Sequence, residues 1–204
     1  MEKAIFLDRD GTLNEDIGYA KSIGDIKLFP QTSATLRALK EMGYTLIVIT
    51  NQAVIARGWL TEEGMKELHQ KYNELLEKQD GVPIDAYYFC PHHPNADILE
   101  YKKVCECRKP AHGLIIKAAK ENNIDLKKSL MIGDKLTDII AGKNAECKTI
   151  LIRTPTSYET NVSGAIADKT ILADYEVDSI ADVVEIVRNF SALNIGKDVN
   201  NLPR

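Results

Sequence analysis

The sequence predicts an α/β fold with three layers, in which a doubly wound, mainly parallel sheet lies between helices. Two observations predict it. Short apolar runs are continuous rather than alternating, which is typical of strands buried on both faces. Amphipathic segments with helical spacing lie between these runs, and such alternation of strand and helix gives a parallel sheet. Ligands of such folds bind beyond the carboxyl ends of the strands, so we expect the functional residues there.

Five apolar runs are expected to form the strands of this sheet. Each is short, and most of its residues are aliphatic or aromatic. None shows the regular alternation of apolar and polar residues that is typical of a strand with one exposed face. The runs cover residues 3–7, 45–49, 86–89, 129–132 and 149–152.

The segments between the runs have the pattern of helices. Residues 31–42 carry Leu36 and Leu39 at helical spacing and stop at Gly43, which suits a C-terminal cap. Thr61 is a suitable N-cap for a second helix, which continues to about residue 78 with one apolar stripe. Three further helices are expected later in the chain: after Pro110, after Thr137 and over residues 179–189.

Residues 1–190 are expected to form a single domain, since a chain of 204 residues suffices for one core of this type. Two long segments, 14–30 and 90–109, do not fit the alternation of strand and helix. We expect both to fold over the site, as functional loops often do. The last stretch, 191–204, is polar and unpatterned and is expected to be a flexible tail.

The composition excludes several classes of protein. Hydrophobic residues make up 44% of the chain and charged residues 27%, as in ordinary globular proteins. A net charge of −4 argues against nucleic-acid binding, which needs a basic face. The apolar run at residues 4–7 is far shorter than a signal peptide requires, and no stretch approaches the length of a membrane span. We therefore expect a cytoplasmic protein that binds no membrane.

A pair of carboxylates, Asp8 and Asp10, directly follows the first apolar run. In extended geometry both side chains leave the strand on the same side. A buried pair of this kind requires either a divalent cation or a shared proton. Gly11 allows the chain to turn sharply here. An isolated pair of this spacing is more often a solvated strand end, so the prediction depends on what lies at the other strand ends.

Polar residues also close the second and fourth strands. Residues 50–52 read Thr-Asn-Gln, and residues 133–138 read GDKLTD. Arg108 and Lys109 stand just before a helix start, where free amides already favour anions. A nucleophile, a proton donor, a metal site and cations are the parts that phosphoryl transfer requires. The role of Asp138 stays open between a part of this site and a cap of the following helix.

Three cysteines and two adjacent histidines, His92 and His93, fall in the segment 90–109. In a reducing compartment this grouping indicates metal binding before disulfide formation, and a closed set of four such ligands is typical of structural zinc. His93 is the alternative histidine, and buried free thiols are the alternative to a metal site. Cys147 lies outside the group and is expected in the core. The expected zinc ligands are Cys90, His92, Cys105 and Cys107.

The motifs DRDGT, TNQ, RKP and GDKLTD resemble, in this order, the four motifs of the haloacid-dehalogenase (HAD) superfamily of phosphatases. The resemblance implies that Asp8 attacks phosphorus and becomes an aspartyl phosphate, while a protonated Asp10 serves as proton donor. It implies that Thr50 and Lys109 hold the phosphoryl oxygens. It further implies Mg²⁺ bound by the side chains of Asp8 and Asp134 and by the backbone carbonyl of Asp10.

The CPHHP and CECRKP segments narrow the resemblance to a branch without a large cap domain. This branch holds the D-glycero-D-manno-heptose 1,7-bisphosphate 7-phosphatases and the histidinol-phosphate phosphatases. The likeness to the heptose enzymes covers about residues 3–190 and implies a monomer acting on a small sugar phosphate for surface glycan synthesis. One departure is Ala53-Val54, where the heptose enzymes usually read Ser-Gly.

The same resemblance implies a set of substrate contacts, with Arg108 as a selectivity residue. Arg57 is expected either to bind a second phosphate or to pair with an acidic neighbour. The implied contacts are Asp16, Ile17, Gly18, Tyr19, Thr50, Asn51, Gln52, Ala53, Arg57, Arg108, Lys109 and Lys135.

Three alternatives stay open. Histidinol phosphate is the second candidate substrate. A receiver domain of a signalling protein also has an acidic pocket with Thr and Lys at strand ends, but it lacks the second acid of the pair and a cysteine cluster. A zinc-binding interaction module would leave the acidic motifs unexplained.

Overall fold

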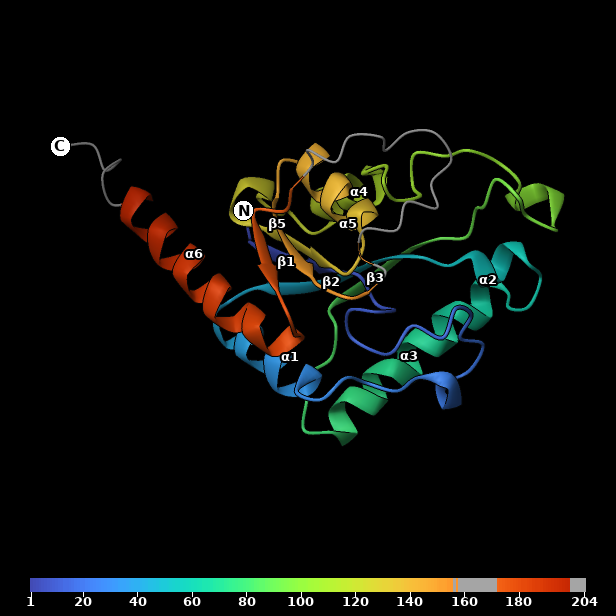
Figure 1. Ribbon diagram of the computed structural model, residues 1–204, viewed down its shortest axis with the longest axis horizontal. Coiled ribbons are helices and arrows are strands. Elements are labelled where there is room, and N and C mark those ends of the chain that lie inside the picture. Colours follow the sequence, from blue (N-terminus) through green and yellow to red (C-terminus); the bar gives the residue numbers. More distant parts are fainter. Residues whose placement is uncertain (156, 158–171, 199–204) are drawn as a thin grey trace.

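The computed structural model describes residues 1–155, 157 and 172–198, and its centre is a six-stranded parallel sheet (Figure 1). The strand order is β3-β2-β1-β4-β5-β6. Every pair of neighbours is parallel, so the predicted fold class is confirmed. The strands are β1 (Ala4–Leu7), β2 (Thr45–Asn51), β3 (Ala86–Cys90), β4 (Leu130–Gly133), β5 (Lys148–Ile152) and β6 (Tyr175–Val177).

Five of these strands agree with the predicted runs to within two residues at each end. The sixth, β6, was not predicted. It has three residues at the edge of the sheet, and a run so short carries no recognisable pattern. The strand order reverses between β1 and β4, which is where a doubly wound sheet leaves a crevice for ligands.

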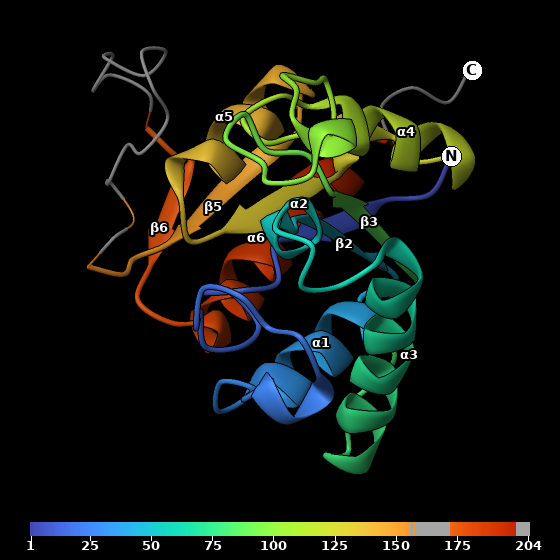
Figure 2. The ribbon, with the colours of Figure 1, turned by 90° about the vertical axis from the view of Figure 1, so that its right-hand side faces the viewer.

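Helices cover both faces of the sheet, as predicted (Figure 2). Helices α1, α3 and α6 pack on one face, where β1 contributes Ile5 and Leu7. Helices α4 and α5 pack on the other, where β1 contributes Ala4 and Phe6. The helices are α1 (Thr32–Glu41), α2 (Ala53–Ala56), α3 (Glu62–Lys78), α4 (Gly113–Glu121), α5 (Leu136–Asn144) and α6 (Val183–Asp198).

The predicted helix boundaries follow from local chemistry. Thr61 caps α3, because its Oγ1 accepts a hydrogen bond from the backbone N–H of Gly64 at 3.0 Å. Gly43 follows α1 with a φ of +80°, the left-handed conformation that commonly ends helices. Helix α2 was not predicted, since four residues are too few to show a period.

The C-terminal helix is longer than predicted. Its expected end at residue 189 is wrong, because α6 continues to Asp198. Residues 191–198 are therefore helical rather than irregular, although their composition is polar enough to resemble a tail. Residues 199–204 of the expected tail lie outside the described part of the chain.

The two long segments contain little regular structure beyond short 3₁₀ turns at Ile23–Asp25 and Leu99–Tyr101. Both pass over the carboxyl ends of the strands. Among the residues that the structure describes, no helix combines the length and the apolar character that crossing a bilayer requires.

Candidate active site

Three carboxylates meet at the carboxyl ends of β1 and β4. Asp8 directly follows β1, Asp134 directly follows β4, and Asp138 lies in the first turn of α5. All three are buried, and one oxygen from each lies within 4.8 Å of the others. The predicted meeting of acids from the first and fourth strands is confirmed. Carboxylates this close repel one another unless cations lie among them.

The chain turns at Gly11, directly after the Asp-Arg-Asp segment. Its φ is +89°, a conformation that residues with a side chain rarely adopt. A Cβ atom at this position would also overlap the carboxylate of Asp134. The next residue, Thr12, donates from Oγ1 to Asp134 Oδ1 at 3.3 Å. The turn therefore holds the first strand's loop directly against the acid of the fourth strand.

Lys109 supplies a buried cation to the carboxylates. Its Nζ lies 2.7 Å from Asp8 Oδ1 and 2.7 Å from Asp138 Oδ1, and it donates to the carbonyl oxygen of Ile49 at 2.7 Å. Asp138 Oδ2 also accepts from the backbone N–H of Lys135 at 3.0 Å, at the start of α5. The two alternatives for Asp138 are both realised, because one oxygen caps the helix and the other binds the site lysine.

The pKa values of two site acids are raised. Burial raises the pKa of Asp8 to about 6, although Lys109 opposes the shift. Burial, followed by repulsion from Asp8, raises the pKa of Asp134 to about 8. Burial alone would lower the pKa of Lys109, but Asp138 and Asp8 outweigh it and raise that pKa. A divalent cation among these oxygens would relieve the repulsion, and an all-oxygen ligand set suits Mg²⁺.

Asp10 has a separate set of partners. Arg9 donates to both of its oxygens, from Nε at 3.1 Å and from Nη2 at 2.7 Å. Asn14 Nδ2 and Gln52 Nε2 each donate to it at 2.9 Å. Burial raises the pKa of Asp10, but Arg9 outweighs burial and lowers it overall. The guanidinium of Arg9 thus favours the ionised carboxylate in the protein alone, and the protonated Asp10 expected during the reaction stays a prediction.

The polar end of β2 connects the parts of the site. Thr50 is 1% exposed, and its Oγ1 accepts from Gln52 Nε2 at 2.9 Å. Asn51 makes two hydrogen bonds to the backbone of Lys109. Its Oδ1 accepts from the Lys109 N–H at 3.0 Å, and its Nδ2 donates to the Lys109 carbonyl oxygen at 3.1 Å. The side chains of Asn51 and Gln52, which were expected to contact substrate, are thus already hydrogen-bonded to protein groups.

A cavity of about 820 Å³ opens beside these residues. Two of the expected substrate contacts do not line it. Ile17 is 54% exposed, and Arg57 donates to the Asn95 carbonyl oxygen at 2.8 Å and lies 3.3 Å from Asp97 Oδ1. The structure therefore favours the ion pair for Arg57. The predicted residues that do line the cavity are Asp8, Asp10, Asp16, Gly18, Tyr19, Thr50, Asn51, Gln52, Ala53, Arg108, Lys109 and Lys135.

The segment 14–30 lies over the cavity, as predicted. Asp16 Oδ2 accepts from Lys135 Nζ at 2.7 Å, which joins this segment to the start of α5. Tyr19 packs edge to face on Trp59, with ring centroids 5.0 Å apart. Two expected substrate contacts, Asp16 and Lys135, are therefore paired with each other in the protein alone.

The predicted zinc ligands form one compact group. The ligand atoms of Cys90, His92, Cys105 and Cys107 lie within 4.8 Å of one another. His92 Nδ1 lies 3.2 Å from Cys107 Sγ, whereas His93 Nδ1 accepts from the backbone of Asn95 at 3.1 Å. His92 rather than His93 therefore faces the thiols. Three thiols and one imidazole in this arrangement suit a tetrahedral zinc ion. Cys147 is buried in the core, as predicted.

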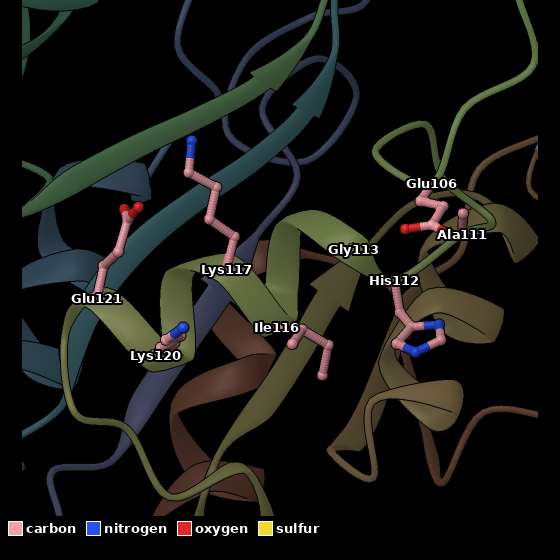
Figure 3. Close-up of a pocket in the computed structure, with 8 residues that line it drawn as sticks. All are labelled: Glu106, Ala111, His112, Gly113, Ile116, Lys117, Lys120 and Glu121. Carbon is pink, nitrogen blue, oxygen red and sulfur yellow. The ribbon is translucent and has the colours of Figure 1, made fainter.

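Another cavity, of about 870 Å³, lies against α4 and next to the cysteine segment (Figure 3). Its charged side chains do not converge. In Figure 3, Lys117 points away from His112, and Lys117 Nζ lies 5.9 Å from the ring centroid of Tyr88. The two cavities have similar volumes, about 870 and 820 Å³. We therefore assign the active site to the cavity beside Asp8 because of the chemistry of its residues.

Comparison with known proteins agrees with this site. A model of the HAD-hydrolase-like family matches residues 106–183. The D-glycero-β-D-manno-heptose-1,7-bisphosphate 7-phosphatase of Haemophilus influenzae is 43% identical over 189 residues, covering 92% of this chain and 98% of that protein. The chain belongs to this phosphatase family. The family member from Escherichia coli K12 is 38% identical over 186 residues, covering 91% of this chain and 93% of its own.

A solved structure of the family has the same fold. The D,D-heptose 1,7-bisphosphate phosphatase of B. bronchiseptica, in complex with magnesium and phosphate, superimposes with a TM-score of 0.74 at 29% identity. The match covers 92% of this chain and 98% of that one. Membership in this phosphatase family excludes the receiver domain and the zinc interaction module as alternatives.

Two residues beside the site were not predicted. Arg9 is fully buried, and its Nη1 lies 3.3 Å from His69 Nε2 on α3. Arg9 follows Leu7 in the alternation of β1, which places it on the face covered by α3. This alternation was available in the sequence, but the contact with His69 spans 60 residues and was not.

Proposed function

We propose that this protein removes the 7-phosphate from D-glycero-D-manno-heptose 1,7-bisphosphate, the reaction for which its family is named. The observation that carries the proposal is the buried carboxylate of Asp8, which lines the cavity and lies 2.7 Å from Lys109 Nζ. Asp10, a second acid that is partly exposed, lines the same cavity. A nucleophile and a proton carrier side by side are what phosphate ester hydrolysis through a covalent intermediate requires.

In the first step an Asp8 oxygen forms a bond to phosphorus as the bond between phosphorus and the sugar oxygen breaks. The leaving oxygen takes a proton from Asp10. In the second step Asp10 takes a proton from water, whose oxygen attacks the aspartyl phosphate. Inorganic phosphate leaves and Asp8 is restored. A phosphate dianion beside Asp10 opposes its ionisation and raises its pKa, which is the direction that a proton donor needs.

Thr50 and Lys109 are proposed to hold the transferring phosphoryl group. Both are buried at the cavity, Thr50 with a hydroxyl and Lys109 with an ammonium. Donors that are already in place stabilise the charge of the transition state without reorganisation. The Asn51 amide fixes the backbone of Lys109 and so contributes indirectly.

Magnesium is proposed to bind at the acidic group. The side chains of Asp8 and Asp134 and the backbone carbonyl of Asp10 would hold it. The bound ion would supply positive charge that draws the phosphate and stabilises the transferring group. Asp138 is committed to Lys109 and to the start of α5, so we do not assign it as a ligand.

Zinc is proposed to bind at Cys90, His92, Cys105 and Cys107 with a structural role. The carbonyl oxygen of His92 accepts from Arg108 Nη1 at 3.1 Å. A fixed cysteine segment would therefore place Arg108 at the cavity, where it is proposed to select the substrate. Asp16, Gly18, Tyr19, Ala53 and Lys135 are the remaining proposed sugar contacts. A cytoplasmic monomer with one domain stays our expectation.

A phosphate-release assay tests the proposal. Purified protein with Mg²⁺ is given both anomers of heptose 1,7-bisphosphate, fructose bisphosphate and histidinol phosphate, and kcat/KM is measured for each. We expect the highest value for one heptose anomer. Comparable values for all four substrates would contradict the assignment, and a preference for histidinol phosphate would support the second candidate substrate.

A further inference from the structure

A fully buried arginine, Arg9, lies between Asp8 and Asp10 in the sequence. Arg9 has an exposed fraction of 0%. A buried guanidinium is costly unless each of its donors has a partner. Its partners are Asp10 on one side and two residues of α3, Met65 and His69, on the other.

The contact with Asp10 is bidentate. Nε of Arg9 donates to Oδ1 at 3.1 Å and Nη2 donates to Oδ2 at 2.7 Å. Two parallel hydrogen bonds fix the plane of a carboxylate, which a single ammonium cannot do. Asn14 donates to Oδ1 and Gln52 to Oδ2, so each oxygen accepts two hydrogen bonds. The Asp10 side chain is still 21% exposed and lines the cavity, so this carboxylate meets the cavity in a set orientation.

The other side of Arg9 is held by His69. Arg9 Nη1 lies 3.3 Å from Nε2 of the imidazole. Because a guanidinium only donates, Nε2 must be the unprotonated nitrogen that accepts. The imidazole stacks on Tyr87 of β3, with ring centroids 4.3 Å apart and 13° between the planes. The ring is fixed by packing and cannot swing away from Arg9.

We infer that Arg9 and His69 are positioning residues, which hold the carboxylate of Asp10 in the orientation from which it exchanges a proton with the leaving oxygen and with water. The inference rests on the proposed role of Asp10. Neither residue lines the cavity, so both act through Asp10 alone. Helix α3, which covers one face of the sheet (Figure 2), is thereby connected to the proton transfer step.

Two variants of His69 test the inference. His69→Phe keeps the stacking on Tyr87 but removes the acceptor, whereas His69→Gln keeps an acceptor near the position of Nε2. We expect the Phe variant to lose roughly 10- to 100-fold in kcat on heptose bisphosphate with little change in KM, because proton transfer contributes about 10²- to 10⁴-fold. We expect the Gln variant to stay near the wild type. Equal kcat for the Phe variant and the wild type would overturn the inference.

A substrate that needs no proton donor separates positioning from a general structural effect. The leaving group of 4-nitrophenyl phosphate departs as a stable anion, so its first-turnover burst reports phosphoryl transfer to Asp8 without proton transfer. We expect this burst to be nearly unchanged in His69→Phe and in Arg9→Lys, while both lose kcat on the sugar phosphate. An equal loss on both substrates would overturn the inference.

The positioning role of Arg9 and His69 can be tested even if the proposed substrate is wrong. If the wild type does not hydrolyse heptose bisphosphate, the proposed function fails. The same comparison is then made with any alkyl phosphate that the wild type hydrolyses. A selective loss on the alkyl phosphate supports the positioning role, and a parallel loss on alkyl and aryl phosphates overturns it.

Discussion

Asp8 and Asp10 lie two residues apart, and their pKa values move in opposite directions. Burial raises the pKa of Asp8, while the bidentate contact with Arg9 lowers the pKa of Asp10. The difference arises from the partner of each carboxylate, because alternation places Asp8 and Asp10 on the same side. Asp8 pairs with Lys109, whereas Arg9, which continues the series that faces α3, donates two hydrogen bonds to Asp10. Acids on one side of a strand therefore acquire different chemistry from the cations that bind them.

Asp8→Asn tests the nucleophile. The amide of asparagine cannot form the aspartyl phosphate, so we expect turnover to fall by roughly 10³-fold or more. Steady-state phosphate release measures the loss, and circular dichroism checks that the fold is retained. Activity near that of the wild type would show that Asp8 is not the nucleophile.

Gly11→Ala tests the turn that brings the strand ends together. A methyl group here meets both a positive φ and the carboxylate of Asp134, so we expect a loss of roughly 1–3 kcal/mol in unfolding free energy together with weaker Mg²⁺ dependence. Denaturant unfolding and activity against Mg²⁺ concentration measure the two effects.

Gly43→Ala is the matched control for this turn. Gly43 has a φ of +80°, and its Cβ would meet only Lys3 Cε at 3.9 Å, an ordinary contact. The backbone strain is therefore similar, but no site residue is displaced. We expect stability to fall and activity to stay. A loss of activity equal to that of Gly11→Ala would contradict the role of the overlap with Asp134.

Among the elements, the segment 90–109 has little regular structure for its length and holds the proposed zinc ligands. Its regular structure is limited to the 3₁₀ turn at Leu99–Tyr101, and Leu99 and Val104 are exposed. Such a segment buries too little apolar surface to hold itself in place. The group of Cys90, His92, Cys105 and Cys107 is therefore proposed to provide its main internal connection when zinc is bound, and to support Arg108 and Lys109 at its end.

Removal of zinc tests this dependence. Metal analysis should find about one zinc per chain, as a closed site of four ligands demands. We expect Cys107→Ser to lose the zinc and to raise KM, because Arg108 and Lys109 lose their support. Cys147→Ala, which changes a thiol outside the group, should keep both the zinc and the KM. Zinc-free protein with normal KM would contradict the structural role.

At the scale of the whole molecule, a buried neutral histidine makes stability depend on pH. Burial, and to a smaller extent the positive charge of Arg9, lowers the pKa of His69 to about 3, well below its ordinary value of 6.5. Between these values the unfolded chain binds a proton that the folded chain does not. The stability contributed by His69 is therefore present above about pH 6.5 and is lost as the pH falls toward 3.

Urea unfolding at pH 7.5 and pH 5.5 measures this loss. One pH unit below the unfolded pKa costs about 1.4 kcal/mol for such a group. We expect the wild type to lose about that much more than His69→Gln, whose side chain does not titrate. An identical pH dependence for the two proteins would show that His69 is not kept neutral by folding.

The sequence alone determined the five main strands, the capped start of α3, the carboxylates at the ends of β1 and β4 and the group of three cysteines and one histidine. These follow from local chemistry, because apolar runs, caps and ligand spacing are properties of neighbouring residues. It also carried the motifs by which the family was identified. It did not reveal β6 or the full length of α6, whose segments are too short or too polar to show a period.

Only the tertiary structure decided how the polar residues at the carboxyl ends of the strands pair with one another. It placed Asp138 on Lys109, paired Asp16 with Lys135, turned Arg57 toward Asp97 and set His69 behind Arg9. The pairs of Asp16 with Lys135 and of Arg57 with Asp97 are partly exposed and form because the folded segments bring opposite charges together. The partners of Lys109 and Arg9 are selected by burial, because a buried charge must find an opposite charge or an acceptor wherever the packed elements bring one close. That requirement acts only after the chain has folded.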